Sequence, residues 1–198
     1  MWAAFSPLPT MPTSSKQRVD AAQPLRRRGG AVVLALLAAL GACSPTLDWR
    51  EVRPPGTAVV ALMPCRPTAS VRSVPLAGQP VRLSMLACKA QDLTWALAAA
   101  DVGDPARVAS VLAALRDSVL ANLEATVVGS EPAAVRGATP GAQPARVRVA
   151  GRKPDGSAAN GQFVVFAHGT QVFEALVIGA AVPEAAAGTF FDSLRAGG

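Results

Sequence analysis

The stretch LTWALAAADVGDPARVASVLAALRDSVLANL, residues 93–123, contains the two strongest local signals in the chain. Its first eight residues are almost wholly apolar. The pair Thr94-Trp95 and the hairpin pattern before it favour a strand here, whereas the alanines that follow are also compatible with a helix. We expect a strand, because a hairpin rhythm precedes it.

Asp104-Pro105 begins the second signal, a helix. Aspartate is a favoured N-cap, and proline is tolerated at the first helical position because its missing N–H would be unpaired there. Apolar residues then recur at helical spacing as far as Leu123, while most charged residues fall off that stripe. The pattern predicts a helix over 104–125 that packs on a sheet.

Strands are predicted on both sides of this helix. Before it, an apolar run at 57–63 and a meander over 70–101 are expected, with turns at Gly78-Gln79 and at 89–92. After it come a proline- and glycine-rich loop and then strands, with a last helix beginning at Pro183-Glu184. The expected loop spans 129–144, and the expected strands are 146–150, 162–168 and 171–178. We therefore predict an α+β fold, an antiparallel β-sheet with one long helix packed on a face and a C-terminal helix beside it.

Charge argues against a nucleic-acid partner. The 198 residues carry a formal charge of +6, but five of the basic residues and one acidic residue lie in positions 1–42. The remainder carries only +2, has few aromatic residues and shows no basic stripe. We expect no nucleic-acid binding.

The N-terminal region has the order of an export signal. A basic run, Arg26 to Arg28, precedes ten apolar residues at 31–40, a length typical of a signal-peptide core and too short to cross a bilayer. The last residue of this run and the three that follow, Leu40-Gly41-Ala42-Cys43, resemble the lipobox of bacterial lipoproteins. That resemblance implies cleavage before Cys43 and acylation of its thiol, with palmitate among the acyl groups.

Three segments follow from this resemblance. They are a removed leader and signal peptide over 1–42, a lipidated tether over 43–56, and a single α+β domain over 57–198. Ser44 stands where an aspartate tends to retain lipoproteins in the inner membrane, so the resemblance implies the periplasmic face of the outer membrane. The alternatives are ordinary secretory cleavage and a retained membrane anchor. Within the tether, Trp49 is expected to pack on its own domain, with a partner-binding role as the alternative.

Few residues suggest chemistry in the exported part. Cys65 and Cys88 remain once Cys43 is acylated, and an even cysteine count in an oxidising compartment favours a structural disulfide over a redox pair. His168 is the only histidine and has no nucleophile motif near it, so we expect a turn residue rather than a general base. No catalytic residue, metal site or cofactor is predicted.

The segments CSPTLDWREVRP (43–54), LMPC (62–65), SMLAC (84–88) and FFDSL (190–194) are similar to a family of uncharacterised betaproteobacterial lipoproteins. This resemblance implies a Gram-negative envelope and a recurring Cys65/Cys88 pair. The order of strands, helix, strands and closing helix also resembles the oxygen-evolving accessory proteins of photosystem II, which act by docking. The expected function is that of an envelope lipoprotein that docks to or supports another envelope component; a periplasmic enzyme for cell wall or lipid and a small-ligand-binding lipoprotein are the alternatives.

Overall fold

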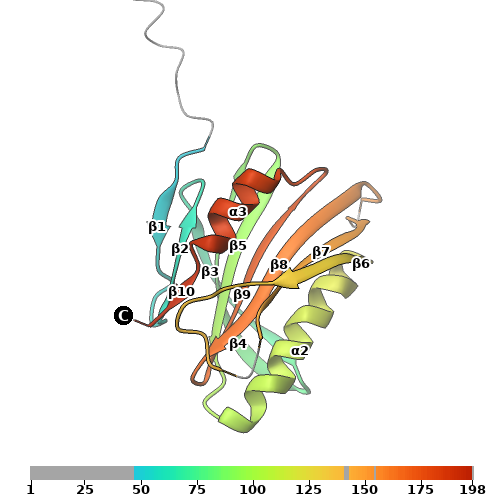
Figure 1. Ribbon diagram of the computed structural model, residues 1–198. Coiled ribbons are helices and arrows are strands. Elements are labelled where there is room, and N and C mark those ends of the chain that lie inside the picture. The colour runs from blue at the N-terminus through green and yellow to red at the C-terminus, as the bar shows by residue number, and fades with distance from the viewer. Residues whose placement is uncertain (1–46, 141–142, 154, 198) are drawn as a thin grey trace, which may run out of the picture. The chain divides into compact units, whose positions relative to one another are not determined.

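The computed structural model describes residues 47–140, 143–153 and 155–197 (Figure 1). The predicted signal peptide and Cys43 lie outside the described residues. Ten strands and two helices are assigned within the described part. In chain order they are β1 (Arg50–Val52), β2 (Val59–Met63), β3 (Thr68–Leu76), β4 (Gln79–Ala90), β5 (Leu93–Asp101), α2 (Pro105–Asn122), β6 (Thr126–Pro132), β7 (Ala145–Arg152), β8 (Ala158–His168), β9 (Gln171–Gly179), α3 (Glu184–Asp192) and β10 (Arg195–Ala196).

The main sheet has seven antiparallel strands in the order β3-β4-β5-β9-β8-β7-β6. The α+β class, the meander and the strand assignment at residues 93–100 are thus confirmed. The first turn lies one residue earlier than predicted: Ala77 and Gly78 take φ values of 49° and 76°, and Leu76 pairs with Gln79. Two consecutive residues of positive φ match the twist of a two-residue hairpin, which explains the shift.

A second sheet of three strands, β1-β2-β10, was not predicted. β1 pairs with β2 across Arg50 and Met63, inside the segment that the sequence assigns to a tether. Ordered structure in this part of the chain therefore begins before Thr57. Both β1 and β10 are three residues or shorter, and strands of that length have too few residues to show an alternating pattern.

The strand β6 is a further correction, because the sequence predicts the end of a helix and the start of a loop there. β6 pairs only with β7, at the edge of the main sheet, and its register shifts between Val127 and Gly129. An edge position tolerates Pro132 and a bulge, since the strand needs hydrogen bonds on one side only. The local composition therefore does not predict β6, because pairing with β7 stabilises this strand.

The two faces of the main sheet bury separate apolar clusters. On one face, Trp95 of β5 is fully buried and meets Phe190 of α3 edge-on at 5.5 Å between ring centroids. Trp49 meets Trp95 in the same way at 6.0 Å, so the predicted packing of Trp49 on its own domain is confirmed. The residues of β2 share this cluster. The small sheet and α3 therefore cover the same face.

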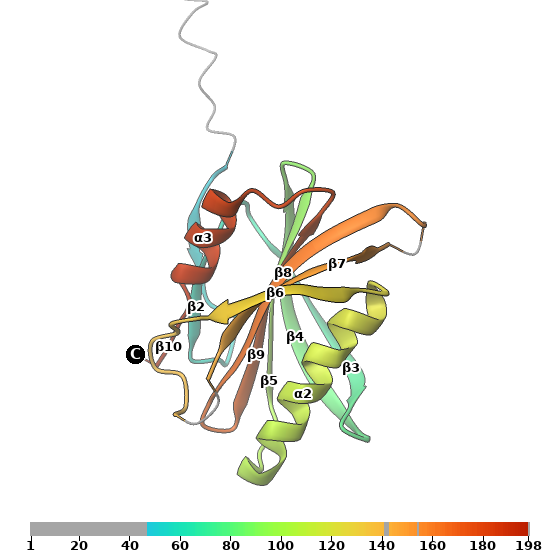
Figure 2. The same cartoon turned by 45° about the vertical axis from the view of Figure 1, so that its right-hand side comes forward.

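The other face contributes to clusters that include α2. Figure 2 shows α2 and α3 at different sides of the main sheet. Asp104 caps the helix by accepting a hydrogen bond from the Ala106 backbone N–H at 2.9 Å. The buried residues of α2 are Val111, Leu112, Leu115 and Val119. They share clusters with residues of β4, β5, β7, β8 and β9, so α3 does not lie beside α2 as expected but contributes to the cluster of the opposite face.

The Cys65–Cys88 disulfide is present, with the two Cα atoms 6.0 Å apart. Cys65 follows the end of β2, and Cys88 lies in β4, so the bond joins the small sheet to the main sheet. The favoured pairing of the two cysteines is thus confirmed. Both side chains also contact the cluster around Trp95.

Replacing both cysteines, Cys65→Ser with Cys88→Ser, is expected to lower the free energy of unfolding by about 3 kcal/mol. The bond closes a loop between positions 23 residues apart, and its loss frees that loop in the unfolded chain. Urea unfolding followed by tryptophan fluorescence measures the change. Reduced wild-type protein is the control and should unfold at the same urea concentration as the double variant; equal stability of oxidised and reduced wild type would contradict the expectation.

Candidate functional site

A mostly apolar hollow lies between α2 and the strands β3, β4, β5 and β9. Its cavity volume is about 430 Å³, within the range of small-molecule sites. We call it the α2 groove. Its principal apolar lining residues are Val74, Leu83, Met85, Ala96, Ala98 and Leu176. Its polar and charged lining residues are Arg72, Ser118, Asn122 and Glu174.

Small side chains on β5 make room for the groove. Successive residues of a strand point to opposite faces, and Leu93, Trp95 and Leu97 all belong to the cluster that contains α3. The residues between them include Ala96 and Ala98, which line the groove. A methyl group in place of a larger side chain at these positions leaves space beside α2 that no other described side chain fills.

Glu174 is the carboxyl group of the groove. It lies on β9, where its register partners are Ala98 of β5 and Val165 of β8, so apolar residues flank it on both sides. Within the described residues, Glu174 has no hydrogen bond and no ion pair from a side chain. Burial raises the pKa of this carboxyl from 4.5 to about 7, because the charged form loses hydration.

Arg72 is the one basic residue that lines the groove, and it comes from the edge strand β3. β4 and β5 separate β3 from β9, so three interstrand steps lie between the two backbones, roughly 14 Å at the usual spacing. Arg72 is exposed to solvent. The groove therefore has a half-buried acid on β9 at one side and a solvated base on β3 at the other.

No protein-family model matches this sequence, and no curated protein matches it. We therefore infer the chemistry of the groove from its own side chains. Aliphatic residues supply a dry surface for an apolar body, and Glu174 supplies one acceptor or, when protonated, one donor. Ser118 carries the one hydroxyl group in the groove lining, and it donates to the Leu115 carbonyl oxygen at 2.7 Å. An activated nucleophile needs a base within hydrogen-bond reach, and the groove lining contains no histidine.

His168 lies where the sequence predicts it, at a hairpin turn. It ends β8 and pairs with Gln171 of β9 across a two-residue turn in which Gly169 takes a φ of 61°. Its Nδ1 lies 2.7 Å from the Gly137 carbonyl oxygen. The imidazole is therefore engaged with the backbone and does not line the groove with Glu174.

Arg146 is a buried cation, but its charge is already compensated. Its Nε donates to Gln162 Oε1 at 2.7 Å, and a terminal nitrogen lies 2.7 Å from a carboxylate oxygen of Glu184. The guanidinium also lies 5.0 Å from the ring centroid of Phe191. These contacts connect α3 to β7 and β8, so we assign Arg146 to the attachment of α3.

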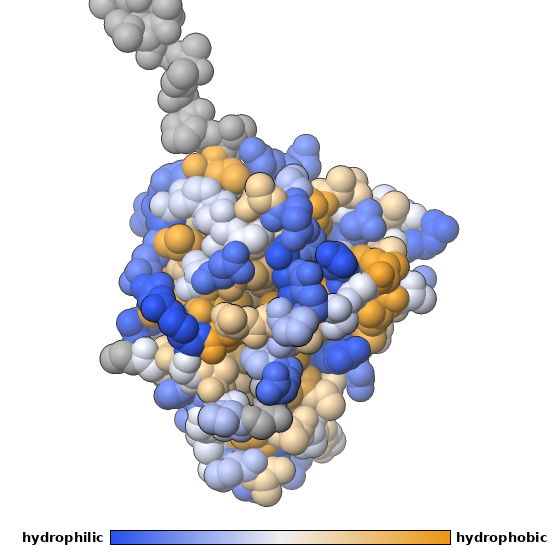
Figure 3. All heavy atoms as spheres, viewed as in Figure 1, coloured by the Kyte–Doolittle hydropathy of each residue, from blue (hydrophilic) through white to orange (hydrophobic). Residues whose placement is uncertain are grey.

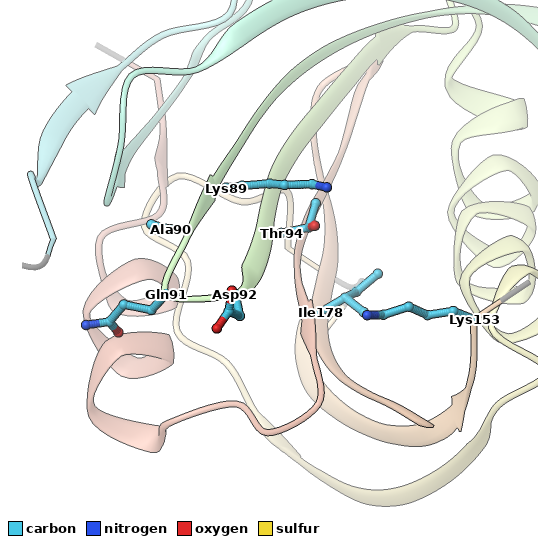
Figure 4. A pocket seen from close by; sticks show the side chains of 7 residues that line it. All are labelled: Lys89, Ala90, Gln91, Asp92, Thr94, Lys153 and Ile178. Carbon is cyan, nitrogen blue, oxygen red and sulfur yellow. The ribbon is translucent and has the colours of Figure 1, made fainter. Parts of the chain in front are cut away.

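A second hollow, of about 370 Å³, is polar (Figure 4). Lys89 and Lys153 extend into it from opposite sides, and Asp92 comes from the turn between β4 and β5. Its position at strand ends leaves both amines near solvent. We find in it no pairing of a nucleophile with a base.

The described surface shows few exposed apolar groups. Figure 3 shows them as separate spots on the face in view rather than as one broad patch. The large apolar side chains that are exposed are Val71, Val127 and Val128. Within residues 47–197 as described, no three histidine, cysteine or acidic side chains gather as a metal site, and neither helix is long and apolar enough to span a bilayer.

Sequence reasoning missed Glu174. A carboxyl group in the middle of an apolar strand, Val-Phe-Glu-Ala-Leu-Val over 172–177, was a detectable signal, because central strands rarely carry an unpaired charge. The pattern alone does not say which face the side chain occupies. The position of α2 decides that Glu174 faces a groove rather than a closed core.

Glu174 is expected to make stability fall between pH 4.5 and 7. The folded carboxyl binds its proton more tightly than the unfolded one, so raising the pH through this window costs the folded state up to about 3 kcal/mol. Glu174→Gln should remove most of that loss. Urea unfolding at pH 4.5, 5.5 and 7.5 measures it. Glu124→Gln, an exposed position after α2, is the matched control; the same pH slope in both variants would contradict the assignment.

Proposed function

We propose that this protein is an envelope lipoprotein whose folded domain binds a small ligand in the α2 groove without changing it chemically. The observation that carries the proposal is the groove itself, a hollow of about 430 Å³ with an apolar lining and one unpartnered carboxyl. Sites of this kind enclose an apolar ligand body and orient it through a few polar groups. We also propose the finer architecture, with α2 as the single long helix across one sheet face.

The groove favours ligand binding over the docking function that the sequence favours. Docking surfaces are shallow and broad, with standard interfaces covering roughly 800 Å² on each partner. The face in Figure 3 has only scattered apolar spots, whereas the groove is recessed between α2 and the sheet. A recessed and mostly apolar site of this volume suits a small molecule better than a folded partner.

Catalysis has less support than binding. An enzyme for cell wall or lipid would need a base, a nucleophile or a metal close together in the site. His168 lies at the turn between β8 and β9, where it contacts the Gly137 carbonyl oxygen, and the groove lining offers one carboxyl without an orienting partner. Holding a ligand is the activity for which the groove has the required groups.

Membrane attachment through Cys43 is the second part of the proposal. Its support is the order of basic run, apolar run and small residues before a cysteine, together with the similarity to betaproteobacterial lipoproteins. The disulfide agrees with an oxidising compartment. We propose the periplasmic face of the outer membrane, because Ser44 follows the cysteine.

Cys43→Ala is expected to remove palmitate labelling and to lower the membrane-bound fraction by more than about tenfold, since stable anchoring requires several acyl chains. Fractionation of cells after metabolic labelling measures both quantities. Cys65→Ser with Cys88→Ser is the matched control, because it removes two other cysteines and should leave labelling unchanged. A Cys43→Ala protein that remains fully membrane-bound would refute the lipid anchor.

Filling the groove is expected to remove the bound ligand. Ala96→Phe places a ring in the space next to Glu174 and should reduce ligand occupancy by more than about tenfold, or at least 1.4 kcal/mol of binding free energy. Ala113→Phe, on the exposed side of α2, is the control. Native mass spectrometry of protein extracted from its own envelope measures occupancy, and thermal melting checks that both variants fold. A ligand retained equally by both variants, or a polypeptide in its place, would contradict the proposed function.

A further inference from the structure

We propose that the ligand of the α2 groove is a small organic cation, a compact apolar body bearing a protonated amine that meets the Glu174 carboxylate. This inference rests on the proposed function and specifies its ligand. The apolar part would occupy the space over Ala96, Leu83 and Met85, and the amine would reach the centre of the sheet beside Ala98.

The first support is the missing partner of Glu174. Its register neighbours Ala98 and Val165 are apolar and offer no donor. Among the described residues, no side chain makes a hydrogen bond or ion pair with this carboxyl. A carboxylate that loses hydration without gaining a partner is destabilised. A cationic ligand offsets part of this loss, because it supplies a positive charge and N–H donors where the side chains around Glu174 supply none.

The second support is the asymmetry of charge in the groove. Arg72 is the one cation that lines the groove, and it lies on β3, three strands away from β9. It is exposed to solvent, so water screens its attraction for an anion. Ser118 and Asn122 of α2 are uncharged. A half-buried acid on the β9 side and a hydrated base on the β3 side favour a cation on the β9 side of the groove.

The third support is size. A hollow of about 430 Å³ holds a small molecule, whereas a helix about 10 Å across or a folded domain does not fit. Ala96 and Ala98 provide a flat floor beside the carboxyl, which suits a compact aliphatic or cyclic body. We therefore commit to a small amine rather than to a lysine presented by a partner protein.

The pH dependence of binding follows from the groups around Glu174. β3 contributes Arg72, which stays charged, while the groove-lining residues of α2, β4 and β5 are uncharged. Val165 on β8 is also uncharged. Glu174 loses its proton above about pH 7, and an aliphatic amine keeps its proton to about pH 10. Amine binding should therefore be strongest between these limits and should weaken as the pH falls below 7.

The test compares three ring compounds of equal size: cyclohexylmethylamine, cyclohexylmethanol and cyclohexanecarboxylate. Full-length protein in non-ionic detergent is titrated with each at pH 8.5 and pH 5.5, and the methyl NMR signals of Leu83, Met85 and Leu176 report binding. At pH 8.5 the amine should bind about tenfold more tightly than the alcohol, the size expected for one added charge-assisted hydrogen bond. This preference should disappear at pH 5.5 and in Glu174→Gln, and Glu124→Gln should retain it.

The outcomes separate this inference from the proposed function. Equal binding of amine and alcohol, or tightest binding of the carboxylate, overturns the amine inference and leaves a ligand-binding groove. The same follows if the molecule that Ala96→Phe displaces carries no amine. If none of the three compounds shifts the groove methyl signals and the extracted protein carries no ligand, both proposals fail. If a polypeptide is found crosslinked to Met85, the amine inference is overturned and the occupant of the groove is a partner protein.

Discussion

The alternation of large and small side chains along β5 is the constraint on which both the core and the groove depend. Leu93, Trp95 and Leu97 fill the face shared with α3, and Trp95 contacts Trp49 and Phe190 edge-on. The alanines between them cannot fill the opposite face. Because a strand sends successive side chains to opposite faces, one sequence supplies a dense core on one side and a hollow on the other.

The Glu174 carboxylate loses hydration because it lies in this hollow. An apolar residue at this position of β9 would pack against Ala98 and Val165 without loss of hydration, whereas the carboxyl pays for its burial whenever it is charged. Arg146 on the opposite face is also buried, but Gln162 accepts a hydrogen bond from its Nε and the Glu184 carboxylate lies 2.7 Å from a terminal nitrogen and balances its charge. Polar groups that a protein buries without a partner are concentrated at sites of function.

Much of the fold was predictable from local sequence, and the exceptions share a cause. The hairpins of β3 to β5, the helix beginning after Asp104 and the turn at His168 each depend on neighbouring residues. The missed strands β1, β6 and β10 are short or lie at an edge, and long-range pairing stabilises them. The same reason explains why α3 was expected beside α2: hydrophobic spacing identifies a buried helix face but not the face of the sheet that it covers.

The sequence by itself determined the two helices and the longer strands other than β6, the signal-like N-terminus ending at Cys43 and the cysteine count that favours the Cys65–Cys88 bond, because these depend on residue order and composition. Only the tertiary structure decided the site. The groove is formed by side chains spread from Arg72 to Leu176 on four strands and a helix, and the shifted pKa of Glu174 arises from burial that those elements create together. Burial is a property of the assembled layers, so no single stretch of sequence contains it.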